Sequence, residues 1–343
     1  MVRLAHCAAS GKKRPARPGE SALVEKVKEI VAEEDPSATL PATRIRVSDT
    51  GRWVGPCSHL AQERERLGSL KFSGFDWKPL GVTLGAEIHG VALGEDLSPE
   101  LVAEIRAALC AFKVLVFRAQ NLSSAQHTGF AKLFGDLEIH PFIPPNPDEP
   151  ELVRFEKGSD ISGYENVWHH DVTWRECPSM GAVLRAVEVP AVGGDTLFCD
   201  MNAAYEGLDA ELRSRVDGLR AVHDYIKAFG HNVPADKVEE MRALYPEVEH
   251  PVVRTHPETG KRCLFVNSIF TREIVGLSPD DSHNLLEELC AEADYPEYQV
   301  RVRWEPGTVV FWDNRAVQHY ASSDYWPQVR IMERASICGD RPV

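Results

Sequence analysis

The sequence has little positive charge and no long apolar run. None of its apolar segments approaches the roughly 18 residues of a membrane span, and its N-terminus lacks the apolar core of a signal peptide. Only 38 lysines and arginines stand against 52 aspartates and glutamates, a net charge of −14. This balance argues against a general nucleic-acid surface and leaves room only for local anion sites. We therefore expect a cytoplasmic protein that binds neither membrane nor nucleic acid.

Several common functional motifs are also missing. The eight cysteines form no C-x-x-C pair and no zinc-finger spacing, so they are expected to be reduced thiols that pack in the interior. The glycine pair Gly193-Gly194 is not followed by the lysine of a phosphate-binding loop. The sequence contains no internal repeat and no Ser-His-Asp order of a hydrolase.

The patterning predicts one large domain behind an N-terminal extension. Residues 1–70 begin with a basic, proline-punctuated stretch that predicts a partly flexible segment, and its function is not assigned. In residues 71–343, Ser98 and Ser123 or Ser124 are expected to cap two helices, and many short strands with long insertions follow. This order predicts a mainly β domain with flanking helices.

A metal site is predicted from three side chains. His169 and Asp171 lie in Trp168–Trp174, which is rich in β-branched and aromatic residues and predicts a strand. Residues two apart on a strand share a face, so both can reach one ion. His319 ends a second predicted strand and would complete two imidazoles and one carboxylate. That set is the facial triad of non-haem Fe(II) oxygenases.

Two arginines follow this triad. Arg330 and Arg334 lie on a predicted strand that we expect to return beside the strand ending at His319. They would then share a face about 13 Å apart, at about 3.3 Å per residue. One interpretation is structural ion pairs with Asp313, Asp324 or Glu333. The other is anion binding, because Fe(II) sites of this type commonly use 2-oxoglutarate, whose far carboxylate needs an arginine.

The motifs around these residues also match a known family. From about Pro79 to Pro342, the chain closely resembles the taurine dioxygenase group of Fe(II)/2-oxoglutarate oxygenases, which includes the 2,4-dichlorophenoxyacetate dioxygenases. The resemblance leaves the first 70 or so residues uncovered. The motifs that carry it are Trp168-His169-His170-Asp171-Val172-Thr173, Gly193-Gly194-Asp195-Thr196-Leu197, Phe311 to Ala321, Asp324-Tyr325 and Arg330 to Ala335.

The resemblance implies a double-stranded β-helix, or jelly roll, and assigns roles to residues of this chain. His169, Asp171 and His319 would bind Fe(II), and Arg330 with Thr196 would bind the distal carboxylate of 2-oxoglutarate, with O2 as the second co-substrate. The resemblance also implies substrate contacts: Arg334 and His140 for an anionic head group, and Val172, Phe229 and Phe270 as apolar walls, for which plain core packing is the alternative.

Two positions depart from the taurine-oxidising pattern. Glu165 stands where an asparagine would assist a sulfonate, with Asn166 beside it, and Ile143 replaces a tyrosine near the metal. A carboxylate close to a sulfonate would repel it unless it is protonated or turned away.

These expectations define an iron- and 2-oxoglutarate-dependent dioxygenase that hydroxylates a small anionic organic molecule. The leading substrate is taurine or a related alkyl sulfonate, which would release sulfite and an aldehyde. Alternatives of the same chemistry are an alkyl sulfate, a carboxylate, or a phosphorylated small molecule such as a nucleotide. An alternative of another class is a jelly-roll binding protein without catalysis. The resemblance further implies a homodimer or homotetramer.

Overall fold

The structure is a computed structural model that describes residues 44–47, 52–140, 148–161 and 165–343. The chain divides into two compact units, Met1–Pro56 and Cys57–Val343. In the first unit, β1 (Ile45–Arg46) pairs antiparallel with β2 (Trp53–Val54). The domain boundary expected after residue 70 stays a prediction.

Three helices of the second unit begin at serine caps. Ser98 accepts a hydrogen bond from the backbone of Leu101 and caps α3, and Ser123 caps α4 in a capping box with Gln126. The side chain of Ser278 accepts a hydrogen bond from the backbone N–H of Asp281 and caps α9. The helices are α2 (Leu60–Gly68), α3 (Pro99–Phe112), α4 (Ser124–Lys132), α5 (Met201–Gly207), α6 (Ala210–Val216), α7 (Tyr225–Phe229), α8 (Val238–Leu244) and α9 (Pro279–Cys290), with short 3-10 turns at Gly230–Asn232, Ala235–Lys237, Ala291–Asp294 and Pro296–Tyr298. None of the helices in the described ranges has the length and apolar character that a membrane crossing requires.

Two sheets form the centre of the unit. The larger has the strand order β3-β4-β5-β15-β7-β17-β6, and the smaller has the order β14-β8-β16. Two further sheets, β10-β9-β13 and β11-β12, lie in the insertions. The strands are β3 (Asp76–Pro79), β4 (Ala86–His89), β5 (Val114–Phe117), β6 (Leu152–Lys157), β7 (Gly181–Glu188), β8 (Thr196–Asp200), β9 (Arg220–His223), β10 (Val248–Pro251), β11 (Val253–Thr255), β12 (Arg262–Leu264), β13 (Thr271–Ile274), β14 (Gln299–Val302), β15 (Val309–Asp313), β16 (Val317–Ala321) and β17 (Arg330–Ile337).

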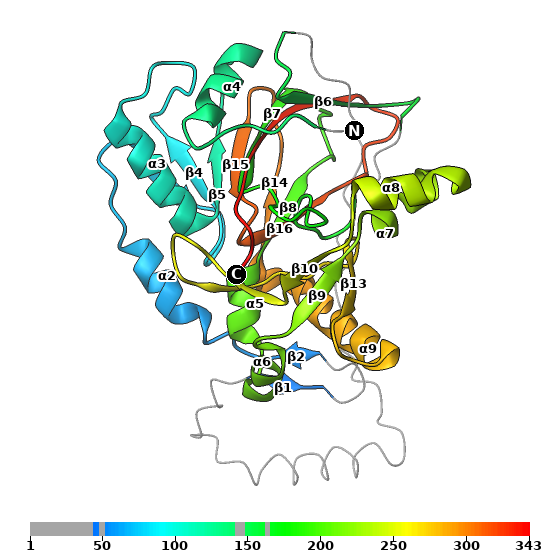
Figure 1. Ribbon diagram of the computed structural model, residues 1–343. Helices are drawn as coiled ribbons and strands as arrows, with labels where there is room; N and C mark the ends of the chain where they lie inside the picture. Colours follow the sequence, from blue (N-terminus) through cyan, green and yellow to red (C-terminus); the bar gives the residue numbers. More distant parts are fainter. Residues whose placement is uncertain (1–43, 48–51, 141–147, 162–164) are drawn as a thin grey trace, which may run out of the picture. The chain divides into compact units, whose positions relative to one another are not determined.

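Alternation along the strands creates two apolar layers. On β15, Val309 and Phe311 belong to the core that packs against α3 and α4, whereas Val310 and Trp312 belong to the core shared with the smaller sheet. The two helices cover the outer face of the larger sheet (Figure 1). On β17, Met332 is in the core between the sheets. Arg330 and Arg334, two residues before and after it, therefore lie on the same interior face of this strand.

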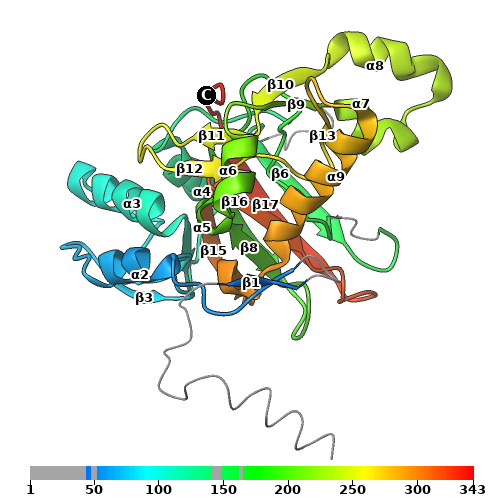
Figure 2. The same ribbon diagram turned by 90° about the horizontal axis from the view of Figure 1, so that it is seen from below.

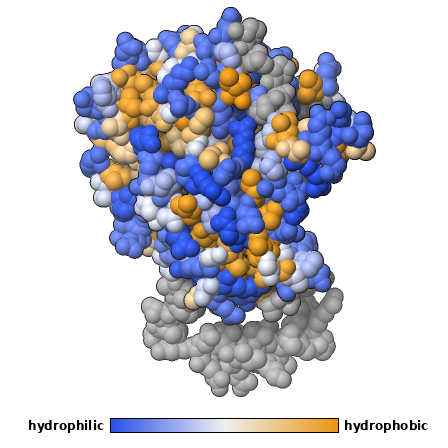
Figure 3. All heavy atoms as spheres, in the orientation of Figure 1, coloured by the Kyte–Doolittle hydropathy of each residue, from blue (hydrophilic) through white to orange (hydrophobic). Residues whose placement is uncertain are grey.

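This arrangement of two facing sheets, with α3 and α4 covering the outer face of the larger one, is the predicted jelly roll (Figure 2). The turn sequence Pro257-Glu258-Thr259-Gly260 predicts a hairpin between His250 and Asn267, and the structure confirms it as β11 paired with β12. On the face shown in Figure 3, hydrophilic residues predominate and apolar ones gather in small groups.

One strand prediction was wrong in a way that matters for the site. The predicted strand that ends at His319 is two strands, because the chain turns at Asp313–Ala316 and passes from the larger sheet (β15) to the smaller one (β16). Consequently β17 does not lie beside β16; it pairs with β6 and β7 in the larger sheet. The arginines of β17 therefore face His319 across the interior between the two sheets.

Candidate metal centre and anion sites

His169, Asp171 and His319 come together as the sequence predicted. Each offers one ligand atom, and these atoms lie within 4.8 Å of one another. His169 and His319 form an isolated antiparallel bridge, in which each backbone N–H donates to the other's carbonyl at 3.1 and 2.9 Å. All three side chains are buried. The bridge attaches the first histidine directly to β16, which carries the second.

The reason for this convergence differs from the predicted one. Trp168–Trp174 is not a strand: only His169 forms a bridge, and the chain then turns over residues 171–174. Val172 has a φ of 48°, in the left-handed region that a β-branched residue rarely adopts. The turn, and not strand alternation, brings the Asp171 carboxylate to the same side as the His169 ring.

Asn314 holds this turn in place. Its side-chain oxygen accepts from the backbone N–H of Asp171 at 2.7 Å, and its amide donates to the carbonyls of Asp171 and Ser179 at 3.1 and 3.0 Å. Asn314 is fully buried in the turn between β15 and β16. A single side chain therefore links the strand connection before His319 to the backbone of Asp171.

A buried ion pair stabilises the turn between β15 and β16. Asp313 accepts two hydrogen bonds from the Arg315 guanidinium at 2.8 and 2.7 Å and one from Nε2 of His256 at 2.9 Å. Nδ1 of His256 accepts from the backbone N–H groups of Glu258 and Thr259, so Nε2 carries the proton. These contacts fix where β16 begins, and with it the position of His319.

The protonation states suit a divalent metal. Nδ1 of His169 lies 2.8 Å from the carbonyl of Val167 and must donate to it, which leaves Nε2 free as a ligand. Burial lowers the pKa of His319 to about 3, so its imidazole is neutral at neutral pH. Burial acts to raise the pKa of Asp171, but Arg334 and the two histidines outweigh it and hold the pKa well below its usual range. The Nε2 atoms of His169 and His319 lie 3.9 and 4.0 Å from the Asp171 carboxylate.

Arg334 lies next to the metal ligands. Its terminal nitrogen donates to both oxygens of Asp171 at 3.1 Å, and its guanidinium lies 5.0 Å from the ring of Phe155. It thus contacts none of the three carboxylates proposed for a structural ion pair. Asp313 pairs with Arg315, Asp324 with Arg301, and Glu333 with Arg185 and Arg154.

Arg330 shares the interior face but has a different environment. It is 8% exposed, and its Nε donates to the carbonyl of Gly194 at 3.1 Å. The rings of Trp304 and Tyr325 each lie 5.9 Å from the guanidinium carbon. Among the described residues, no carboxylate pairs with it and its terminal nitrogens have no hydrogen-bond partner. Burial lowers its pKa, so an anion at this point would restore a missing interaction.

Thr196 contacts Trp304, the tryptophan whose ring lies beside Arg330. It begins β8, is buried, and its hydroxyl oxygen accepts from the indole N–H of Trp304 at 3.0 Å. Sequence reasoning missed Trp304 and Asn314. No spacing rule could have revealed them, because they act through hydrogen bonds to residues 108 and 143 positions away.

The predicted apolar wall is part of an aromatic cluster beside the metal ligands. Phe270 lies 6.4 Å from the ring of His169, and Phe229 lies 5.9 Å from Phe270. Val172 packs against the same cluster, which also holds Trp174 and Tyr225. Most of these residues come from α7, α8 and the adjoining loops, that is, from insertions outside the two central sheets.

The other predicted substrate residues lie in different places. His140 is half-buried, and burial together with Arg334 and Arg175 lowers its pKa to about 4, so its imidazole is neutral at neutral pH. Glu165 is exposed and pairs with Lys157 at 3.2 Å. On β6, Lys157 is the partner of Arg330 and not of Arg334. Asn166 is exposed, and Ile143 lies outside the described residues.

Comparison with known proteins bears on this site as a whole. The family model described as "Taurine catabolism dioxygenase TauD, TfdA family" matches residues 76–336. An alpha-ketoglutarate-dependent sulfate ester dioxygenase of Pseudomonas putida is 40% identical over 78% of this chain and 91% of its own. An alkylsulfatase of Acinetobacter baylyi is 38% identical over 75% of this chain and 83% of its own. The crystal structure of a taurine dioxygenase from Burkholderia xenovorans is 40% identical and superposes with a TM-score of 0.69, covering 79% of this chain and 93% of that one.

Proposed function

The chain belongs to the TauD, TfdA family of taurine catabolism dioxygenases, and from that premise we propose that it oxidises a small organic sulfate or sulfonate with an apolar carbon skeleton. Membership makes it an iron- and 2-oxoglutarate-dependent dioxygenase. The observation that carries the substrate proposal is the position of Asp171, which has the Arg334 guanidinium on one side and an aromatic cluster nearby.

His169, Asp171 and His319 would hold Fe(II). Two neutral imidazoles and one carboxylate are the donor set that such iron sites use, and the free Nε2 atoms face the Asp171 carboxylate. With 2-oxoglutarate and O2, the bound iron supplies the oxidation of an unactivated C–H bond, while 2-oxoglutarate is converted to succinate and CO2. The protein's part is to select which C–H bond is within reach.

Arg330 and Thr196 would bind the distal carboxylate of 2-oxoglutarate. The guanidinium is buried without a carboxylate partner among the described residues, and it lies on the same interior face of β17 as Arg334. A bidentate pair with a carboxylate would satisfy its terminal nitrogens. The Thr196 hydroxyl would add a third donor.

Arg334 would bind the anionic head group of the substrate, with His140 as a neutral hydrogen-bond donor. The remainder of the substrate would then lie against Phe270, Phe229 and Val172. An alkyl chain gains free energy when it leaves water for such a surface. The ammonium group of taurine would lose hydration there, which favours an alkyl sulfate or sulfonate over taurine.

This arrangement predicts the products. Hydroxylation of the carbon that bears the ester oxygen of an alkyl sulfate gives an unstable 1-hydroxyalkyl sulfate, whose C–O bond to the sulfate breaks to yield an aldehyde, sulfate and a proton. The same reaction on a sulfonate breaks the C–S bond and yields an aldehyde, sulfite and a proton. In both cases O2 and 2-oxoglutarate are consumed, and succinate and CO2 balance the equation.

The test is a substrate panel with the Fe(II)-loaded full chain. Hexyl sulfate, hexanesulfonate, taurine and phenoxyacetate are assayed for succinate, aldehyde, sulfate and sulfite. We expect hexyl sulfate or hexanesulfonate to be turned over with the highest kcat/KM. His319→Ala should abolish substrate-dependent succinate formation, whereas His283→Ala, at an exposed position on α9, should not change it. Preference for taurine or phenoxyacetate would refute the proposed substrate; unchanged turnover by His319→Ala would refute the metal assignment.

We also propose that the chain functions in the cytoplasm as a homodimer or homotetramer, as the family resemblance implies. Light scattering of the purified full chain would test the assembly. A mass equal to 38.2 kDa would contradict it.

A further inference from the structure

Trp304 lies just after β14 and is 3% exposed. Its indole N–H donates to Thr196 Oγ1 at 3.0 Å, and its ring lies 5.9 Å from the guanidinium carbon of Arg330. We propose that Trp304 is a positioning residue for 2-oxoglutarate, which aims the Thr196 hydroxyl and the Arg330 guanidinium at one carboxylate. This inference rests on the proposed function, in which those two residues bind the co-substrate.

The hydrogen bond between Trp304 and Thr196 has a fixed direction. An indole N–H can only donate, whereas a threonine hydroxyl has one proton to donate and two lone pairs to accept with. Because Trp304 occupies a lone pair, the hydroxyl proton of Thr196 remains available. The described residues offer no acceptor for it, although Thr196 is only 2% exposed. A buried hydroxyl in this state is prepared to donate to an incoming carboxylate.

The Arg330 side chain is held by contacts at its Nε atom and on the faces of its guanidinium. The carbonyl of Gly194 accepts from Nε, and the rings of Trp304 and Tyr325 flank the guanidinium. Gly194 has a φ of +70°, and a Cβ there would approach Arg330 Cδ to 3.1 Å and Tyr325 Cδ1 to 3.2 Å. The side chain is thus held by its inner end and its faces, which leaves the terminal nitrogens for a ligand. Trp304 is the residue that contacts both Arg330 and Thr196.

Burial alone does not explain the hydrogen bond of Trp304. Trp312 is also buried, in the core between the sheets, yet its indole nitrogen has no hydrogen-bond partner among the described residues. An unpaired indole N–H is therefore tolerated in this interior, so the pairing of Trp304 with Thr196 points to the ligand site.

The experiment measures binding of two oxo acids to the full chain loaded with Mn(II), by titration calorimetry. One ligand is 2-oxoglutarate, and the other is 2-oxopentanoate, which has the same carbon chain without the distal carboxylate. Trp304→Phe keeps an aromatic ring beside Arg330 and removes the N–H donor together with part of the indole ring. We expect this variant to bind 2-oxoglutarate about tenfold more weakly and 2-oxopentanoate within about twofold of the wild type. Trp77→Phe, at a partly buried tryptophan against Phe112, is the matched control and should change neither.

A double-mutant cycle tests the route through Thr196. Thr196→Val should weaken 2-oxoglutarate binding, and adding Trp304→Phe to it should have almost no further effect, because the hydroxyl it would orient is gone. Independent, multiplicative losses would overturn the inference, as would an equal loss for both oxo acids, which indicates a merely structural role. If Trp304→Phe does not fold, replacement of Trp304 by β-(3-benzothienyl)alanine keeps the ring shape and removes the N–H.

Arg330→Gln separates this inference from the proposed function. If that variant binds 2-oxoglutarate as tightly as the wild type, the proposed co-substrate site is wrong and the role of Trp304 falls with it. If Arg330→Gln binds weakly but Trp304→Phe binds normally, only the role of Trp304 is refuted.

Discussion

The two ends of the interior face of β17 are built by different means. Around Arg330, every neighbour named above comes from the two central sheets or the short connections between their strands: Gly194, Thr196, Trp304 and Tyr325. Around Arg334, Phe155 comes from β6 of the larger sheet, whereas the aromatic cluster beside His169 comes mostly from α7, α8 and their loops, and from the turn after Asp171. The end assigned to 2-oxoglutarate is therefore part of the scaffold, and the end assigned to the substrate is completed by appended segments.

This difference matches the two tasks. The co-substrate is the same for every substrate that such chemistry uses, so its site can be built into the core. A substrate site needs to vary between related enzymes, and loops and insertions change at less cost to the fold than core strands do. The relatives that match this chain are named for a sulfate ester, an alkyl sulfate and taurine, a variety that a scaffold-built substrate end would not easily allow.

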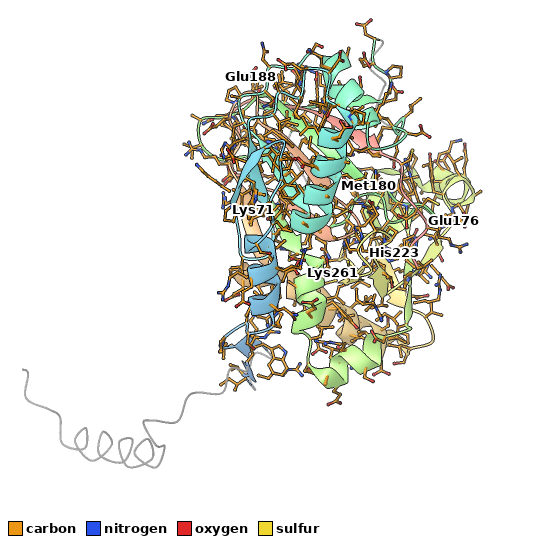
Figure 4. The ribbon with its side chains drawn as sticks, turned by 90° about the vertical axis from the view of Figure 1, so that its left-hand side faces the viewer. Lys71, Glu176, Met180, Glu188, His223 and Lys261 are labelled. Carbon is orange, nitrogen blue, oxygen red and sulfur yellow. The ribbon has the colours of Figure 1, made fainter. Side chains whose placement is uncertain are left out.

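The largest expected effect is acid unfolding, which would destroy both ends of the site together. His127, His170, His223 and His250 are buried, and burial lowers the pKa of each; for His127 and His250 the value is about 4. Figure 4 shows the His223 side chain within the body of the protein, in contrast to Glu176 at its edge.

Proton binding determines whether the free energy of unfolding rises or falls with pH. Above pH 6.5 these histidines are neutral in both the folded and unfolded chains, so their contribution to stability is constant. As the pH falls from 6.5 to about 4, the unfolded chain binds protons that the folded one does not, and the free energy of unfolding decreases. Each of His127 and His250 costs about 3 kcal/mol across this range.

Urea unfolding at pH 7, 5.5 and 4.5 measures this loss. The dependence of the unfolding free energy on pH reports how many protons the chain takes up when it unfolds. His127→Gln should reduce that number by up to one, and His283→Gln, at an exposed position, should leave it unchanged. A free energy of unfolding that stays constant between pH 6.5 and 4.5 would contradict the role of the buried histidines.

An intermediate effect should separate the two ends. Arg330→Gln is expected to weaken 2-oxoglutarate binding by about 100-fold, because it leaves a carboxylate without its charged partner. Arg334→Gln should raise the KM for the sulfate or sulfonate by a comparable factor while the affinity for 2-oxoglutarate changes by less than about threefold. Calorimetry and initial rates measure the two quantities. If each variant impairs both ligands equally, the two ends are not independent.

The smallest effect should refine the substrate end alone. Phe229→Ala removes an aromatic wall that packs near Phe270, so the KM for hexyl sulfate should rise about fivefold, as expected for roughly 1 kcal/mol of lost apolar contact. Ethyl sulfate, which is too short to use the whole cluster, should be affected by less than about twofold. Val192→Ala, at an exposed valine, serves as the control. An equal change for both esters would show that Phe229 does not line the path of the chain.

Part of the site could be predicted and part could not. The two histidines, the aspartate and the two arginines are residue types with a strong chemical meaning, and their order along the chain is informative. Their geometry was less accessible: the segment around His169 has the composition of a strand but forms a turn, because Asn314 satisfies the backbone of Asp171 from 143 residues away. The proposed partners of Arg330 and Arg334 were wrong for the same reason, since sequence proximity does not determine which carboxylate is near.

The sequence by itself determined the fold class, the capped helices and the set of groups available for chemistry, because periodicity, capping and ligand type are local properties. Only the tertiary structure decided that β15 and β16 belong to different sheets, that β17 faces His319 across the interior, and that Trp304 contacts both Thr196 and Arg330. These relations depend on packing and hydrogen bonds between segments distant in sequence, where burial removes the alternative of bonding to water.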